Sequence, residues 1–175
     1  MGTVAIVDYG VGNLKSVANA LSYLGCSSCI TADLAELERA DAIILPGVGA
    51  FPDAADRLRS GGLDQHVLAQ GQKKPVLGIC LGMQLLLEQG REVRPCPGLG
   101  VIRGTVDRIP TQSKLPHIGW NSLRFFHHSP LFRGLDEGAY VYFVHSFSAQ
   151  DTDPAQVIAV TDYGPAVTAA VSSGN

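Results

Sequence analysis

Two patterns of secondary structure follow one another along this chain, and the change between them constrains the fold most. Up to about residue 91, short β-rich runs alternate with segments whose apolar residues have helical spacing. The predicted strands are 4–8, 28–31, 42–45 and 75–79, and the predicted helices are 14–24, 52–58, 63–69 and 81–89. Beyond a predicted turn at 95–98, strand follows strand, at 101–109, 118–125, 140–148, 157–161 and 166–171. We therefore expect an α/β fold with a mostly parallel central sheet, helices on both faces, and antiparallel strands added in the C-terminal half.

Length and composition fit a single packed domain covering residues 1–175. Apolar residues make up 46% of the chain and charged residues only 17%, which excludes a disordered polymer. A formal net charge of -3 without a Lys/Arg cluster argues against nucleic acid as a partner. No apolar run approaches the roughly 20 residues of a membrane span, and no signal peptide precedes the first strand. We therefore expect a cytoplasmic protein with no membrane partner.

The segment Gly78-Ile-Cys80-Leu-Gly82 lies where a predicted strand meets a predicted helix. A G-x-C-x-G sequence at such a junction is typical of a nucleophile elbow, with sulfur in place of oxygen. The two glycines allow a sharp turn, so that Cys80 projects over the C-terminal edge of the sheet. The helix N-terminus favours the thiolate, and the Leu81 N–H is free to bind an oxyanion. A buried structural cysteine is the alternative, but strand, glycines and helix together favour a nucleophile.

Two glycine-rich segments follow predicted strands. Pro46-Gly-Val-Gly49 leaves backbone N–H groups open to a ligand, although a tight turn would look the same. Gly10-Val-Gly12-Asn-Leu-Lys15, with Asp33 further on, partly matches a dinucleotide fingerprint. Lys15 stands where a small residue must let helix and strand pack together. We therefore expect no nucleotide cofactor.

Four cysteines are too few for a disulfide scaffold. Cys26-Ser-Ser-Cys29 has the spacing of a redox pair, but it follows a predicted helix and Gly25 instead of opening a helix. Two thiols in a loop are the preferred interpretation. No second pair completes a tetrahedral set, so no metal site is expected.

A cysteine nucleophile needs a base, usually a histidine that a carboxylate orients. His66 is predicted on an exposed helix, and His127 and His128 in a polar loop. His145 lies in an apolar strand and should be at least half buried, and His117 precedes a Gly-Trp pair. None of the five has a carboxylate two residues later, so the residues alone assign no base.

Five segments together resemble a known family. They are Asp8-Tyr-Gly-Val-Gly-Asn-Leu14, Pro46-Gly-Val-Gly-Ala-Phe51, Gly78-Ile-Cys-Leu-Gly-Met-Gln84, Pro116-His-Ile-Gly-Trp-Asn121 and Tyr142-Phe-Val-His-Ser146. From residue 4 to about residue 171, the chain is similar to the glutaminase subunits of imidazole glycerol phosphate synthase, which are class I glutamine amidotransferases. The cysteine elbow is common to that whole class, whereas P-H-x-G-W-N and D-Y-G-x-G-N are more specific to this subunit. The resemblance implies a flavodoxin-like fold.

The resemblance also implies a reaction and a partner. Cys80 would attack the side-chain amide of glutamine, release ammonia and leave a glutamyl thioester, which water hydrolyses to glutamate. The ammonia would pass to a separate (β/α)8 cyclase subunit that makes imidazole glycerol phosphate in histidine biosynthesis. Trp120 is either an interface anchor or part of the core. The implied site residues are Gln84, Tyr142, His145 and Ser146 for glutamine, Leu81, Val48 and Gly49 for the oxyanion hole, and Asn13, Trp120 and Asn121 for the interface.

One segment of the family pattern, the F-H-P-E that carries the triad histidine and glutamate, does not occur in the 175 residues. The sequence therefore predicts either a glutaminase subunit that is C-terminally truncated at Asn175 and lacks the family's last helix, or a catalytically dead subunit that docks to the cyclase and regulates it. An unrelated cysteine hydrolase or redox protein is the third alternative. Without that segment, we expect exposed apolar surface, an exposed strand edge and little glutaminase activity.

Overall fold

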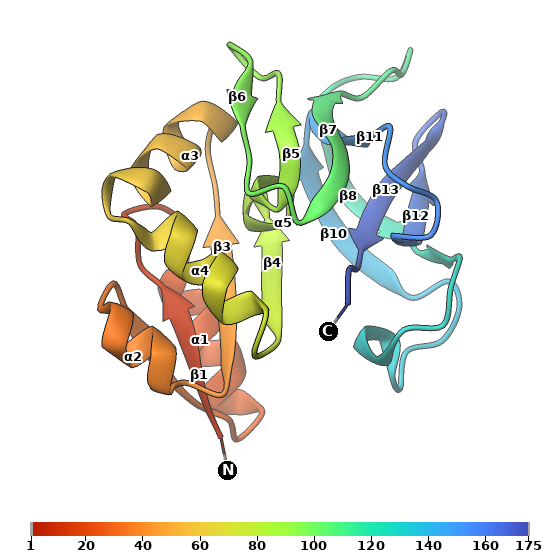
Figure 1. Cartoon of the computed structure of the whole chain (residues 1–175). Coiled ribbons are helices and arrows are strands. Elements are labelled where there is room, and N and C mark those ends of the chain that lie inside the picture. Colours follow the sequence, from red (N-terminus) through yellow and green to blue (C-terminus); the bar gives the residue numbers. More distant parts are fainter. Residues whose placement is uncertain (1, 175) are drawn as a thin grey trace.

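The N-terminal half of the chain forms the parallel sheet that the sequence predicts. The structure, a computed structural model, describes residues 2–174 (Figure 1). The elements of this half are β1 (Thr3–Val7), α1 (Leu14–Tyr23), β2 (Ser27–Thr31), α2 (Leu34–Arg39), β3 (Ala42–Gly47), α3 (Phe51–Ser60), α4 (Leu63–Gly71), β4 (Val76–Cys80) and α5 (Leu81–Leu85). The strands pair in the order β2-β1-β3-β4, all in parallel. The C-terminal ends of β3 and β4 therefore share one edge of the sheet.

Helices cover both faces of this sheet. On one face, α2, α3, α4 and α5 pack their apolar residues against β1 and β3 to form the main core (Figure 1). Phe51 of α3 and Leu37 of α2 are fully buried there. On the other face lies α1, and none of its residues is buried. Asn13 caps α1 by accepting from the Ser16 N–H at 3.3 Å, and Asp33 caps α2 in the same way.

β4 forms one edge of the sheet, because within residues 2–174 it pairs with β3 alone. Leu77 and Ile79 of β4 are 39% and 38% exposed. Together with the half-exposed α1, this edge confirms the expected exposed apolar surface and strand edge.

The C-terminal half consists of short strands in three small sheets. Their elements are β5 (Leu87–Gly90), β6 (Cys96–Pro97), β7 (Ile102–Arg108), β8 (His117–Ser122), β9 (Arg124–Phe125), the 3₁₀ turn η1 (Pro130–Phe132), β10 (Tyr140–His145), β11 (Phe147–Gln150), β12 (Val157–Asp162) and β13 (Ala166–Val171). The described residues pair as β11-β7-β5-β6, β10-β8 and β13-β12-β9. All these pairs are antiparallel except β5 with β7. The predicted antiparallel additions are thus present, but as separate sheets beside the parallel one.

The sequence-based boundaries are wrong in four places. The helix predicted over 81–89 ends at Leu85, because the carbonyls of Leu85, Leu87 and Glu88 accept from Leu99, Gly100 and Gly98, which draws 87–90 into a strand. The turn predicted at 95–98 contains β6. The strands predicted over 118–125 and 140–148 are each divided in two. Tertiary pairing overrides local propensity in all four places.

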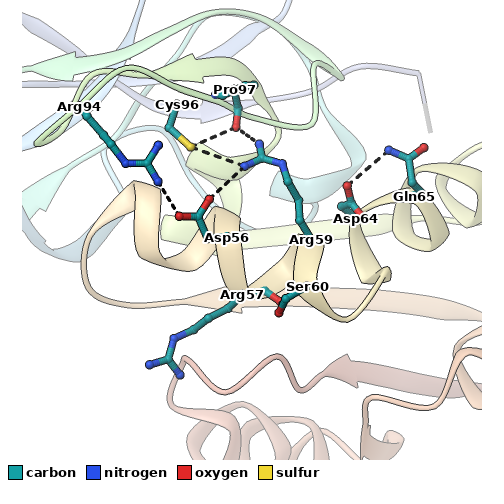
Figure 2. A network of polar contacts seen from close by, with 9 residues as sticks. All are labelled: Asp56, Arg57, Arg59, Ser60, Asp64, Gln65, Arg94, Cys96 and Pro97. Atoms are coloured by element: carbon teal, nitrogen blue, oxygen red, sulfur yellow. Dashed lines mark hydrogen bonds and ion pairs between the residues drawn. The ribbon is translucent and has the colours of Figure 1, made fainter.

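A polar network fastens α3 to the first part of the C-terminal half (Figure 2). Asp56 forms an ion pair with Arg94, and Arg59 donates to the Cys96 sulfur at 3.6 Å and to the Pro97 carbonyl. Cys96 itself is 1% exposed. These contacts hold α3 against β6 and make Cys96 a buried structural thiol.

No helix within the described residues is long and apolar enough to cross a bilayer.

Candidate active site

The junction of β4 and α5 has the backbone of a nucleophile elbow. Cys80 has φ +55° and ψ −118°, a conformation that non-glycine residues rarely adopt, and it is the N-cap of α5. Its side chain is exposed. As the N-cap, Cys80 lies next to the first N–H groups of α5, which have no intrahelical partner. The predicted elbow is therefore present in the backbone.

The two glycines of the G-x-C-x-G segment are required by close backbone contacts. A Cβ on Gly82 would lie 1.8 Å from the Leu45 carbonyl oxygen, and a Cβ on Gly78 would lie 2.6 Å from the Met83 nitrogen. Both distances are shorter than any real Cβ contact. The close packing of α5 on β3 and β4 thus depends on glycine at these positions.

The predicted oxyanion segment lies beside the cysteine. Gly47 is the register partner of Cys80, and a Cβ on Gly47 would lie 2.8 Å from the Gly82 nitrogen. Val48 and Gly49 follow directly, Val48 being 53% exposed and Gly49 having φ +92°. The backbone of 48–49 and the start of α5 thus meet at one edge of the sheet.

Tyr9 contacts the end of β3 at this edge. Its role was not predicted from the sequence. Its hydroxyl donates to the Pro46 carbonyl at 2.6 Å, and the residue is 7% exposed. Burial, and then the nearby Cys80, raise the pKa of the Tyr9 phenol. Its position in the D-Y-G-x-G-N segment was the available signal. Gly12 of the same segment has φ +108° and packs on Pro46, so this segment forms a turn beneath the site.

The predicted glutamine-binding residues come from both halves of the chain. Two of them, Gln84 and His145, form hydrogen bonds to the same oxygen, the Phe147 carbonyl. Gln84 of α5 is 8% exposed, and its amide Nε2 donates to the Phe147 carbonyl at 3.0 Å. His145 Nδ1 lies 3.0 Å from the same oxygen. Ser146 lies between β10 and β11, where its carbonyl accepts from the Ile109 N–H. The end of β10 is therefore fastened to the helix that follows Cys80.

His117 and His145 form a hydrogen-bonded pair that the sequence did not predict. His117 Nδ1 and His145 Nε2 are 3.0 Å apart, and His117 is 3% exposed. His117 stacks between Phe143 and Tyr163, with ring centroids 4.8 and 4.0 Å away. Burial, and then His145, lower the pKa of His117. Burial also lowers the pKa of His145, against a raising effect of its bond to Phe147. His117 faces His145 across the β8–β10 ladder.

The remaining histidines lie apart from this cluster. His127 and His128 are exposed, as predicted. His66 is half buried and its Nε2 has no hydrogen-bond partner, so the fully solvated surface position expected for it is wrong. The cause is the packing of α4 against α2 and α3, which covers part of its face.

Strands β8 and β10 present an apolar outer face. Five large side chains of this face are 56–70% exposed: Ile118, Trp120, Tyr140, Tyr142 and Val144. Trp120 and Tyr142 are register partners and their rings meet edge to face at 5.7 Å. Trp120 therefore lies on the surface and not in the core, and its role as an interface anchor stays a prediction.

The side-chain amides of Asn13 and Asn121 form hydrogen bonds within the chain. Asn13 caps α1. The Asn121 Nδ2 donates to the Asp162 carbonyl at 2.9 Å, and its Oδ1 accepts from the Ser122 N–H at 2.8 Å.

All four cysteines are free thiols. Cys26 lies in the loop before β2, as predicted, but Cys29 lies within β2. Burial, and then Glu36, raise the pKa of the Cys29 thiol, although Arg39 opposes them. The described residues contain no group of three His, Cys, Asp or Glu side chains placed to hold a metal ion.

Comparison with known proteins assigns the family. A family model described as glutamine amidotransferase class-I matches residues 5–175, and the chain belongs to this family. It is 46% identical over 173 residues to "Imidazole glycerol phosphate synthase subunit HisH" of Oceanobacillus iheyensis, a match covering 98% of this chain and 86% of that protein. The identity to the subunit of the same name from Bacillus cereus (strain ATCC 14579) is also 46%, over 98% of this chain and 82% of that protein.

Solved structures agree on the fold. A "Crystal structure of glutamine amidotransferase" superposes with a TM-score of 0.71 at 20% identity, covering 91% of this chain and 80% of that one. A "Structure of PurLQS from Thermotoga maritima" gives a TM-score of 0.67 at 20% identity, covering 96% of this chain and 77% of that one. The predicted family and fold are therefore confirmed.

Proposed function

We propose that this chain is the glutaminase subunit of an imidazole glycerol phosphate synthase, which hydrolyses glutamine to glutamate and ammonia at Cys80. The observation that carries the proposal is the Cys80 backbone, strained at φ +55° between β4 and α5. Membership of the amidotransferase family and the names of the two 46% identical relatives support it.

The reaction follows from the groups around the sulfur. The Cys80 thiolate attacks the side-chain amide carbon of glutamine, and the carbonyl oxygen becomes an oxyanion. The Leu81 N–H and the backbone of Val48 and Gly49 are the proposed donors to it. The C–N bond then breaks, the nitrogen takes up a proton and leaves as ammonia, and water hydrolyses the thioester to glutamate.

Gln84, His145 and Ser146 are the proposed contacts to the amino-acid end of glutamine. The Tyr142 side chain, expected in the same set, lies instead on the outer face of β10 beside Trp120. The bonds of Gln84 and His145 to the Phe147 carbonyl support this set, because they draw the end of β10 toward α5.

The outer face of β8 and β10 is the proposed docking surface for the (β/α)8 cyclase subunit, which receives the ammonia. Exposed aromatic rings such as Trp120, 70% exposed, are the side chains that most often dominate binding at interfaces. Contacts of Asn13 and Asn121 with that partner, and the cytoplasmic location, stay predictions.

A second candidate is a docking subunit without glutaminase activity, and the bonding of the two histidines of the site favours it. His117 and His145 already bond to each other, to Phe147 and to Asn121. Neither is therefore free to take the Cys80 proton. Loss of general acid–base help costs about 10² to 10⁴-fold, so we expect residues 1–175 alone to hydrolyse glutamine slowly, and directly supplied ammonia to bypass the defect at the cyclase.

The test is selective labelling with a glutamine analogue that carries a chloroketone, followed by peptide mass spectrometry. Cys80 should be alkylated before Cys26, Cys29 or Cys96, and excess glutamine should protect it. A Cys80→Ala variant is the control and should take up no glutamine-protected label. Faster labelling of another cysteine in the folded protein would contradict the proposal. A labelled but inactive chain would favour the second candidate.

A further inference from the structure

A continuous chain of hydrogen bonds runs from strand β8 to the helix that follows Cys80. Asn121 Nδ2 lies 3.4 Å from His117 Nε2, and His117 Nδ1 lies 3.0 Å from His145 Nε2. His145 Nδ1 lies 3.0 Å from the Phe147 carbonyl, which also accepts from Gln84 Nε2. The catalytic chemistry described above uses none of the bonds between these side chains.

The partners at the two ends determine where each proton lies. The Phe147 carbonyl only accepts, so His145 Nδ1 carries a hydrogen. Asn121 Oδ1 accepts from the Ser122 N–H, which fixes Nδ2 as the atom facing His117, and Nδ2 only donates. His117 Nε2 therefore accepts, and His117 Nδ1 donates to His145 Nε2. Both rings are neutral, and every bond of the chain has one donor and one acceptor.

One added proton breaks this chain wherever it binds. In the neutral pair, one ring hydrogen lies on His145 Nδ1 and one lies between the two rings. A third ring hydrogen must then lie on His117 Nε2, where it faces the N–H of the Asn121 amide. The lowered pKa values of both histidines agree with a neutral pair at pH 7.

Few charged groups adjoin the pair. Tyr163 stacks on His117 and donates to the Lys114 carbonyl, and Asp162 pairs with Arg124 at 3.6 Å. Arg108 of β7 is the register partner of Phe147. On α5, the titratable group is Cys80 at its N-cap. None of the carboxylates among these contacts either imidazole.

We propose that His117 and His145 are positioning residues, whose neutral hydrogen-bonded pair holds the Phe147 carbonyl and Gln84 in place for glutamine at Cys80 and fastens this site to strand β8. The inference rests on the proposed function. It assigns the two histidines a role in substrate capture that needs neither of them as a base.

The test compares two alkylation rates at Cys80 in the whole chain, one with the glutamine chloroketone and one with iodoacetamide. Both reagents need the thiolate, so their ratio cancels changes in thiolate content and reports glutamine recognition alone. His117→Phe keeps a ring between Phe143 and Tyr163 but removes both hydrogen bonds. It should lower the ratio about tenfold or more, since small displacements of binding groups have effects of this size.

His117→Gln restores a donor to His145 and should bring the ratio back to within about threefold of the unmodified chain. Tyr163→Phe is the matched control, because it keeps the ring on His117 and removes a nearby hydrogen bond outside the chain. An unchanged ratio in His117→Phe, or an equal loss in Tyr163→Phe, would overturn the proposal.

The pH profile of the unmodified chain tests the same idea without a substitution. The ratio should stay constant above about pH 6.5 and fall at lower pH as the pair gains a proton, because the pKa of both histidines lies below the usual 6.5. It should stay flat in His117→Gln, because the amide can turn to accept from a charged His145. Nitrogen NMR at about pH 7.5 should show both rings neutral with the hydrogen on Nδ1. A ratio that stays flat at acid pH while NMR shows that the pair gains a proton, or a charged ring at about pH 7.5, would refute the proposed role of the neutral pair. Failure of the chloroketone to label Cys80 at all would instead contradict the proposed function.

Discussion

The elbow around Cys80 and the histidine pair behind β10 are both parts of the candidate site, but different forces hold them. At the elbow, two backbone segments pack directly against each other. A Cβ added to Gly82 would lie 1.8 Å from the Leu45 carbonyl oxygen. At the histidine pair, side-chain rings and amides span the space between strands. The elbow should therefore tolerate almost no added atoms and be insensitive to pH, whereas the pair should tolerate rings of similar shape and depend on protonation.

The largest expected effect is at the elbow. Gly82→Ala forces α5 away from β3 and should lower the free energy of unfolding by about 3 kcal/mol or more, the upper range for overpacking. Urea unfolding measures it. Gly71→Ala is the matched control, because its Cβ would meet only Val76 at an ordinary 3.4 Å. Equal stability of the two variants would mean that backbone contact does not fix the elbow.

The outer face of β8 should behave in the opposite way. Trp120→Ala should weaken binding to the cyclase partner by about 2 kcal/mol, as expected for a central aromatic anchor. The unfolding free energy of the isolated chain should change little, because the ring is 70% exposed. Calorimetric titration and urea unfolding measure the two quantities. Unfolding of the variant would instead assign the ring to the fold.

Acid should lower the free energy of unfolding through the histidine pair, by a smaller amount than the substitutions above. Both histidines have a pKa below the usual 6.5 in the folded chain, so the unfolded chain takes up protons first as the pH falls. Their contribution to stability is complete above about pH 6.5 and is lost below it. The urea midpoint should therefore decrease between about pH 7 and about pH 5.5. His117→Phe should show a shallower decrease, and an identical slope in both proteins would contradict this origin.

The smallest effect is expected at an exposed ion pair between β12 and β9. The Asp162 carboxylate pairs with Arg124 at 3.6 Å, with side chains 74% and 50% exposed. Asp162→Asn should change the unfolding free energy by less than about 0.5 kcal/mol, as for other exposed ion pairs. Urea unfolding checks it. A larger loss would show that the Asp162 carboxylate also stabilises the histidine pair, in addition to the Asp162 carbonyl that accepts from Asn121 Nδ2.

Local patterns were sufficient wherever the fold depends on neighbours in sequence. The parallel strands, α1 and the Gly78–Gly82 elbow follow from periodicity and glycine spacing. The six-residue helix α2 was not located, because it is too short for a clear period. The end of α5 at Leu85 depends on pairing with 98–100, which no local pattern reveals.

The same limit applies to the candidate site. The elbow backbone at Cys80 could be predicted, because its strand, turn and helix are contiguous. The contact between His117 and His145 could not, because it joins residues 28 apart through a register that becomes apparent only in three dimensions. Tyr9 was missed for a similar reason, since its partner Pro46 is 37 residues away.

The start of α3 has a consequence for how the chain is made. The Phe51 N–H is bonded to the Glu92 carboxylate at 2.9 Å, and the Phe51 ring fills the space that a Cβ on Gly90 would occupy. While the chain emerges from the ribosome, α3 and the Val48–Gly49 turn before it must wait for about forty further residues before either partner is available. The strands of the parallel sheet are synthesised first. The Val48–Gly49 turn beside Cys80 can gain these two contacts only after the β5–β6 hairpin has been synthesised.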